Sequence, residues 1–173
     1  MKRFLIAIVA LAAGFATLSA QKIGYINTET ILNDIPAYVA AQNQLNTLSD
    51  KYKATIETEM GKIEALYQTY QSNRNSMTAS QRQSAENEII SKERVVQEKQ
   101  KIYFGEDGIM AKKAEELLSP IQQQVDKAIA RVAALGGFDM IIDVAAVQGI
   151  VYKNPDLDLS QQVLTLYLKE NQQ

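Results

Sequence analysis

Apolar side chains recur every three or four residues through the first half of the chain, which is the spacing of an amphipathic α-helix. The stripe over residues 37–70 consists of Leu45, Leu48, Tyr52, Ile56, Met60, Ile63, Tyr67 and Tyr70. Proline suits the first turn of a helix but not its interior, so Asn33-Asp34-Ile35-Pro36 predicts a break near Asp34 before this helix. A helix of this length would extend about 50 Å.

A second helical pattern runs from Thr78, where the sequence TASQ has the form of a capping box, to a glycine pair that follows Leu135. One apolar residue recurs at a strict interval of seven, at Ile89, Val96, Tyr103, Met110 and Leu117, and Val95, Ile102 and Ile109 widen this stripe. The complementary heptad position is polar as far as residue 107, so half of the expected apolar seam is missing there. Beyond Leu117 the stripe fills in with Ile121, Val125, Ala128, Val132 and Leu135.

A polar segment at residues 71–77 joins the two helical patterns and predicts an antiparallel helical hairpin. Its base is expected to be well packed and its distal part loosely packed. Gly105 and Gly108 interrupt the second pattern, and each is unfavourable inside a helix. A hinge, a local kink and a helix break all remain open at this position.

The end of the chain changes to the alternating pattern of β-structure. The sequence GFDMIIDVAAVQGIVYKN at residues 137–154 predicts a β-hairpin, with strands at 138–144 and 149–152. Lys22–Ile26 offers one more strand, and the helical hairpin returns the chain to its start. Asp158 is expected to cap a final helix over which Val163, Leu166 and Tyr167 form an apolar face.

Three short strands leave open edges, which proteins normally cover. Pairing with the same strands of sibling chains would cover them, so we expect a homo-oligomer whose number the pattern does not fix. The side chains expected in this oligomerisation body are Ile23, Tyr25, Ile26, Phe138, Met140, Ile142, Val144, Ile150 and Tyr152.

The first twenty residues have the form of a secretory signal peptide. Lys2 and Arg3 precede an uncharged apolar run at residues 4–18, and cleavage is expected near Ala20. The fold class is therefore α+β and predominantly helical. The domains are a signal peptide at 1–20, a discontinuous β-body at 21–36 and 136–173, and a helical arm at 37–135.

Composition argues against an enzyme. The chain contains no cysteine and no histidine, which removes the thiol nucleophile, the usual acid–base group at neutral pH and the commonest metal ligands. Asp139 and Asp143 share a strand face, but nothing near them in the sequence supplies a nucleophile, so structural or interface roles are expected. No catalytic, cofactor-binding or metal-binding residues are predicted, and neither a cofactor nor nucleic acid is expected to bind.

The two ends of the mature sequence resemble the Skp/OmpH family of periplasmic chaperones. The resemblance is carried by KIGYINTETILNDIP at the start and by GFDMIIDVAAVQGIVYKNPDLDLSQQVLTLYLKE at the end. It implies a homotrimer in the periplasm, with a small β-body completed by trimerisation and three helical arms around a cavity. Family members hold unfolded outer-membrane proteins there without ATP and prevent their aggregation.

The arm departs from the family in charge. Family members are often strongly basic, whereas residues 40–135 carry 13 basic and 13 acidic side chains. Only the tip keeps a positive charge, because Arg74 and Arg82 lie in an interval without acidic residues. This charge predicts weak contact of the arm tips with a membrane surface.

Two functions follow for the arm. As a holdase, its loosely packed part would offer apolar contacts to unfolded chains, with candidate contacts at Tyr52, Tyr67, Tyr70, Tyr103 and Phe104. Each of these side chains has core packing as its alternative role, because stripes at helical spacing usually pack inside. The second function is a structural coiled-coil spacer or adaptor of the cell envelope that docks onto one folded partner.

Overall fold

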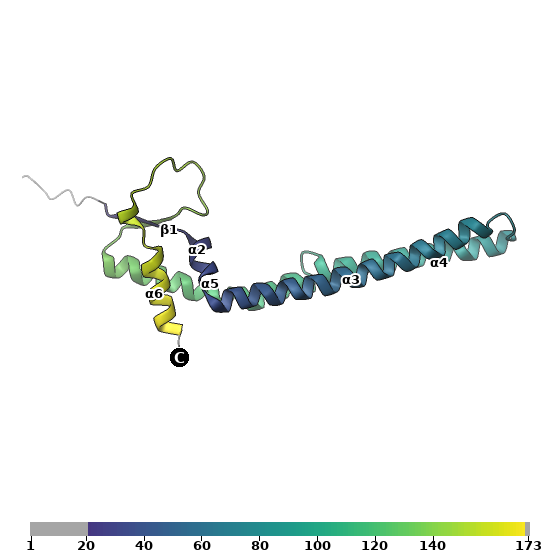
Figure 1. Cartoon of the computed structure of the whole chain (residues 1–173), viewed down its shortest axis with the longest axis horizontal. Helices are drawn as coiled ribbons and strands as arrows, with labels where there is room; N and C mark the ends of the chain where they lie inside the picture. The colour runs from purple at the N-terminus through teal and green to yellow at the C-terminus, as the bar shows by residue number, and fades with distance from the viewer. Residues whose placement is uncertain (1–20, 172–173) are drawn as a thin grey trace, which may run out of the picture. The chain divides into compact units, whose positions relative to one another are not determined.

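The computed structural model describes residues 21–171, so the predicted signal peptide lies outside the described part of the chain (Figure 1). This part forms two compact units. One unit contains the residues as far as Ile31 together with those from Ala128 onward, and the other contains Leu32–Lys127. The sequence predicts domain boundaries at residues 36 and 136, and these boundaries stay a prediction.

The first unit is built on two short parallel strands. Strand β1 (Ile23–Ile26) pairs with β2 (Met140–Asp143) in a register that places Ile23 opposite Met140 and Ile26 opposite Asp143. Parallel pairing requires a long crossover between the strands, and the helices between them provide it. The prediction that the two ends of the mature chain meet is therefore confirmed.

The predicted hairpin between residues 138–144 and 149–152 is wrong. After β2 the chain forms an open loop, and residues 149–152 have no strand partner within the described residues (Figure 1). Gly149 adopts a φ of 92°, which breaks the extended conformation that a returning strand needs. β2 pairs instead with β1, a strand from the other end of the sequence.

Helical segments complete this unit. They are the first part of α2 (Thr28–Asn33), the last part of α5 (Ile109–Gly136), the 3₁₀ turn η1 (Pro155–Leu157) and α6 (Ser160–Asn171). Leu159 donates its N–H to the carbonyl of Tyr25 at 2.8 Å, which places the start of α6 against β1. A Cβ on Gly24 would lie only 2.5 Å from Leu159 Cδ1, so glycine permits this approach. The core of the unit comprises Tyr25, Ile26, Ile31, Ala128, Val132, Leu159, Val163, Leu164 and Tyr167.

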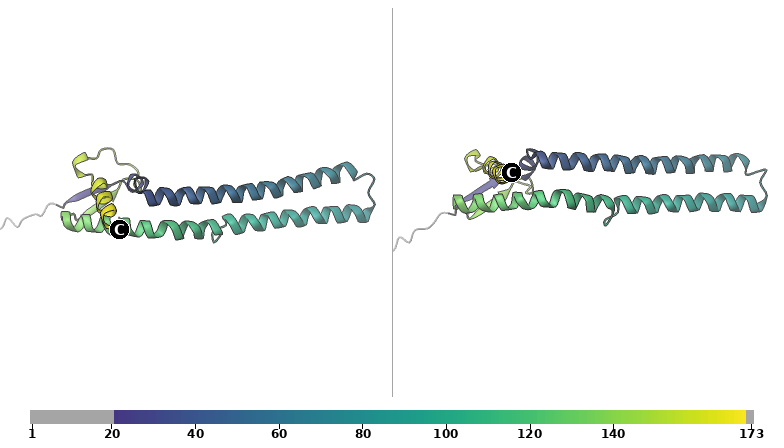
Figure 2. Two further views of the ribbon diagram at one scale, coloured as in Figure 1. Left: turned by 60° about the horizontal axis from the view of Figure 1, so that its bottom comes forward. Right: turned by 90° about the horizontal axis from the view of Figure 1, so that it is seen from below.

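The second unit is the antiparallel helical hairpin. Its limbs are α3 (Pro36–Asn73) on one side and α4 (Ala79–Phe104) followed by the first part of α5 (Ile109–Gly136) on the other (Figure 2). The break near Asp34 and the helix start at Pro36 are confirmed. So is the capping box, because Thr78 accepts from the N–H of Gln81 while the Gln81 side chain accepts from the N–H of Thr78.

The single helix predicted from Thr78 to Leu135 is wrong. Residues 105–108 form a tight turn between α4 and α5, so the structure adopts the helix break that the sequence left open. At the other end, α5 stops at Gly136 and Gly137 adopts a φ of 64°, as the glycine pair predicts. The predominantly helical α+β class, with a small sheet and a long helical hairpin, is confirmed.

Candidate binding surface of the helical arm

The contact between α3 and α4 is apolar at only a few levels. The buried side chains in this contact are Ile56 and Tyr70 from α3, and Ile89 and Val96 from α4. Between these levels the seam is polar, because Lys99 Nζ lies 3.3 Å from Glu59 Oε1 across the two helices. This hydrogen bond, supported by Lys62, lowers the pKa of Glu59 from its ordinary value. The half-apolar seam expected from the heptads is thus filled in part by a charge pair.

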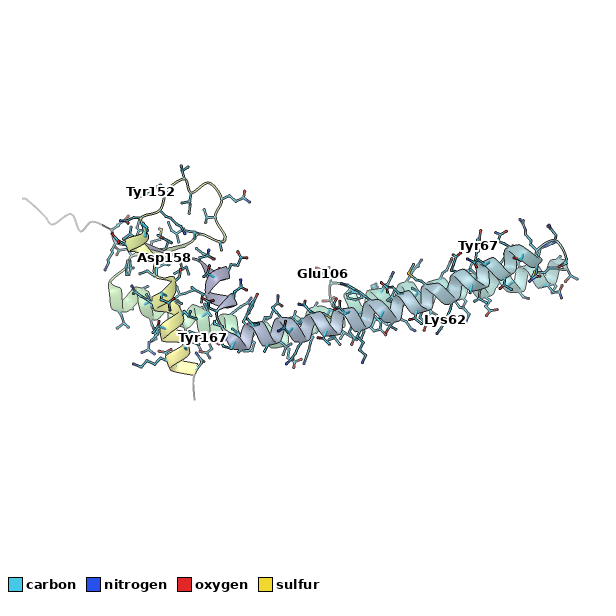
Figure 3. The ribbon with its side chains drawn as sticks, viewed as in Figure 1. Lys62, Tyr67, Glu106, Tyr152, Asp158 and Tyr167 are labelled. Atoms are coloured by element: carbon cyan, nitrogen blue, oxygen red, sulfur yellow. The ribbon has the colours of Figure 1, made fainter. Side chains whose placement is uncertain are left out.

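A second polar contact lies near the tip of the arm. Tyr70 is 7% exposed, and its hydroxyl donates a hydrogen bond to a carboxylate oxygen of Glu86. The bond to Glu86 and the burial of the ring both raise the pKa of Tyr70. Tyr70 therefore packs inside, in the alternative role that the sequence allowed, whereas Tyr67 on the same helix is 46% exposed (Figure 3).

Three aromatic side chains meet beside the helix break. The rings of Tyr52 and Tyr103 stack with their centroids 4.1 Å apart and their planes within 10°. The ring of Phe104 meets both of them edge-on at 6.4 Å and is 41% exposed. The structure thus brings together three of the five aromatic residues that the sequence proposed for client contact, and leaves Phe104 accessible.

Large apolar side chains lie exposed on the outside of the arm. We call Met60, Tyr67, Ile90, Val95, Ile102 and Phe104 the exposed apolar set; each is more than 40% exposed. Ile90 was missed by the sequence reasoning. The available signal was its position directly after Ile89 in the stripe, which turns it about 100° away from the buried face.

An open groove of about 470 Å³ runs between α3 and α4 next to this set. Apolar side chains of Met60, Ile63 and Val96 line it, together with polar groups of Glu64, Glu93, Gln97 and Gln100. A shallow surface of this kind can take apolar side chains from an extended polypeptide but has no enclosed cavity for a small ligand.

The arm also contains the predicted positively charged tip and the glycine-containing helix break. Arg82 is half-buried and its guanidinium lies 3.5 Å from the carbonyl oxygen of Arg74, which is exposed. Gly105 and Gly108 begin and end the turn between α4 and α5. A hinge at these glycines stays a prediction.

The residues predicted for the oligomerisation body fall into two groups. Tyr25 and Ile26 are buried, and Phe138 is half-buried beside Gly24 and Gly136. Ile142 and Val144 are half-buried as well, and the other four are exposed, Met140 to 55% and Tyr152 to 81%. Tyr152 is labelled in Figure 3. One open cavity of about 260 Å³ in this unit gathers most of the predicted residues, and its lining includes Ile23, Tyr25, Ile142, Val144, Ile150 and Tyr152.

Two aspartates organise this unit. Asp143 accepts hydrogen bonds from the N–H and hydroxyl of Thr28, at 3.1 and 2.5 Å, and Asp158 accepts from the N–H and hydroxyl of Ser160, at 2.9 and 2.6 Å. Burial of each carboxylate opposes its charge, but the hydrogen bonds prevail and lower both pKa values from their ordinary level. Burial, followed by the charge of Asp158, raises the pKa of Tyr25.

Neither aspartate belongs to a metal-binding cluster. Within residues 21–171 no three His, Cys, Asp or Glu side chains lie close enough together to hold a metal ion. None of the helices in this range combines the length and the apolar character needed to cross a membrane.

Comparison with known proteins relates nearly the whole chain to one family. The family model described as "Outer membrane protein (OmpH-like)" matches residues 22–167. The chain is 27% identical over 167 residues to the chaperone protein Skp of Yersinia enterocolitica, covering 95% of this chain and 98% of that protein. An OmpH-like outer membrane chaperone from Caulobacter crescentus has the same fold, with a TM-score of 0.66 and 14% identity over 91% of this chain and 89% of the other.

Proposed function

The chain belongs to the OmpH-like outer membrane protein family, and on this premise we propose that it is an ATP-independent periplasmic chaperone that holds unfolded outer-membrane proteins. The observation that carries the proposal is the exposed apolar set on the arm. Four of its six side chains lie on α4 and two on α3, and extended apolar surface that stays exposed commonly serves binding. The related Yersinia protein is named a chaperone.

Binding would rest on many weak contacts. Each apolar contact contributes on the order of 25 cal/mol for every Å² removed from water. The described groove of the arm is open and not a deep pocket that selects one side chain, so this surface fits unfolded chains of different sequence. Because the basic and acidic side chains of the arm balance, apolar contacts rather than charge would carry the affinity, and added salt should change it little.

We propose that the chain works as a homotrimer. Each strand has four residues, and the free edge of β2 is uncovered within the described residues. Residues 149–152 have the β-forming sequence GIVY and no partner in their own chain, and Val151 is 99% exposed. Sibling chains would supply the missing pairing, and the arms would then surround a shared cavity in which clients are held.

The direct test is suppression of aggregation. An unfolded outer-membrane β-barrel protein is diluted from urea into the mature chain without nucleotide, and turbidity is followed. We expect turbidity to be abolished at one trimer per client, and the same barrel in its folded form should not bind. Turbidity that is unchanged at this ratio would refute the holdase. Capture of one folded envelope protein, with no effect on unfolded chains, would instead support the spacer or adaptor.

A further inference from the structure

Residues 105–108 leave the helical limb as one tight turn. The N–H of Gly105 donates to the carbonyl of Lys101 at 2.8 Å and ends α4, and the N–H of Gly108 donates to the carbonyl of Gly105 at 2.9 Å and closes the turn. The N–H of Lys112 then donates to the carbonyl of Gly108 at 3.1 Å and starts α5. The two helices continue along one line on either side of the turn, which projects from the arm (Figures 2 and 3).

Four residues correspond to about one turn of α-helix. They would rotate a continuous helix by about 400°, which is one full turn plus 40°, and lengthen it by about 6 Å. Tyr103 and Met110 are three helical steps apart with the turn expelled and seven steps apart with it included. Both spacings return a side chain to the same face. This explains why the interval of seven continues through the break to Met110 and Leu117, which are half-buried in the expelled form.

The two glycines select the expelled form. A Cβ on Gly105 would lie 2.4 Å from the carbonyl oxygen of Lys101. A Cβ on Gly108 would lie 2.9 Å from the carbonyl oxygens of Gly105 and Ile102. Glycine is also a poor residue inside a helix, so it disfavours the continuous form. The expelled turn therefore depends on the absence of side chains at these two positions.

We propose that the α4–α5 limb has two conformations. In the one described here, residues 105–108 are expelled from the helix as a turn; in the other, they are taken up and α4 and α5 form one continuous helix. We call residues 105–108 a one-turn length reserve. Packing against α3 differs on the two sides of the turn. On the α4 side, the Tyr52–Tyr103 stack and the Glu59–Lys99 pair fix the register. On the α5 side, Lys113 and Leu117 line an open groove of about 430 Å³ with α3, so a one-turn shift of the first part of α5 breaks fewer contacts with α3. This inference concerns the length of the limb and is independent of client binding.

The test measures a distance across the turn. The chain has no cysteine, so the exposed residues Glu98 and Glu115 can be replaced by cysteine and spin-labelled, with labelled chains diluted into unlabelled ones. Along the helix axis the two positions are about 20 Å apart with the turn expelled and about 26 Å apart with it included. We expect the shorter distance in the parent chain. The double substitution G105A and G108A should move the main distance about 6 Å longer, because it obstructs the turn and favours the helix.

Two further variants keep the test decisive. Gly61 lies in α3 with open space around its Cβ position, so G61A raises helix propensity in the same arm and should leave the distance unchanged. Deletion of residues 105–108 should yield a folded arm that keeps the shorter distance. An unchanged distance in the double alanine variant, or loss of helix in the deletion variant, would overturn the length reserve.

Discussion

Single side chains fix the places where distant segments of this chain meet. Asp143 ends β2, and its carboxylate accepts from the N–H and hydroxyl of Thr28, which follows β1, and from the N–H of Ala145 at 3.0 Å. One acceptor thus holds the start of α2 and the loop after β2. The sequence predicted a structural role for this aspartate, but not Thr28 as its partner, because the two residues are 115 positions apart.

Replacing Asp143 by asparagine should lower the free energy of unfolding by about 1–2 kcal/mol at pH 7, since charge-assisted hydrogen bonds are lost. The lowered pKa of Asp143 fixes the sign of the pH dependence. The stabilisation is complete above the unfolded pKa of about 3.9 and disappears as the pH falls through the folded pKa. Thermal unfolding of parent and D143N from pH 7 to pH 2 measures this, with the exposed Asp156→Asn as control. A difference that stayed constant with pH would contradict this role.

At the scale of elements, periodicity and end signals predicted the helices well. The proline at α3, the capping box at α4 and the glycine pair after α5 all describe the chain's own neighbours, so they can be read locally. Partner choice cannot be read in this way. Residues 149–152 have strand-forming side chains, yet β2 pairs with β1, and Glu59 gives no sign in the sequence that Lys99 lies opposite.

The burial of individual stripe residues was also only partly predictable. Met60 and Leu135 follow the helical spacing but are 52% and 79% exposed. A periodic stripe specifies a face, whereas burial requires a facing helix at that level. Polar pairs occupy two levels of the α3–α4 contact, Glu59–Lys99 and Tyr70–Glu86, and apolar residues of the arm remain uncovered. The candidate binding surface arises from this mismatch.

The Glu59–Lys99 pair should stabilise the α3–α4 register in a pH-dependent way. Because the pKa of Glu59 is lowered by Lys99, the stabilisation is present above the unfolded pKa of about 4.3 and is lost as the pH falls through the folded value. Glu59→Gln should therefore reduce the Tm at pH 7 slightly and leave it unchanged at low pH. Differential scanning calorimetry measures both, and Glu57→Gln, whose carboxylate is exposed, is the matched control. An equal reduction of the Tm at both pH values would argue against the ion pair.

At the scale of the whole molecule, the β-structure is too small to be complete. Two four-residue strands and an unpaired loop with Ile150, Val151 and Tyr152 exposed leave hydrogen-bonding edges and apolar surface uncovered. The sequence predicted this deficit from the number of strand candidates, although it placed the loop in a hairpin. The number of chains in the proposed oligomer comes only from the family resemblance.

Light scattering should therefore give a mass of three chains for the mature protein, and one chain for the double variant Ile150→Asp and Tyr152→Asp. Both side chains are exposed in the single chain, so its helix content by circular dichroism should be unchanged. Met60→Asp on the arm should remain trimeric. A parent protein that is monomeric, or a double variant that stays trimeric, would contradict the proposed assembly.

The central claim is that exposed apolar side chains of the arm bind unfolded clients. The variant that tests it replaces four residues of α4 by serine: Ile90, Val95, Ile102 and Phe104. Its matched control replaces four exposed charged residues of the same helix by serine and keeps the net charge: Glu88, Arg94, Glu98 and Lys101. Neither set supplies a buried side chain, so both variants should keep the helix content of the parent.

The deciding measurement is the Kd for an unfolded outer-membrane β-barrel protein, obtained by fluorescence titration of the parent chain and both variants. The account predicts at least tenfold weaker binding by the apolar variant, equivalent to about 1.4 kcal/mol, and parental affinity for the charge control. Parental affinity of the apolar variant, or an equal loss in the charge control, would contradict it.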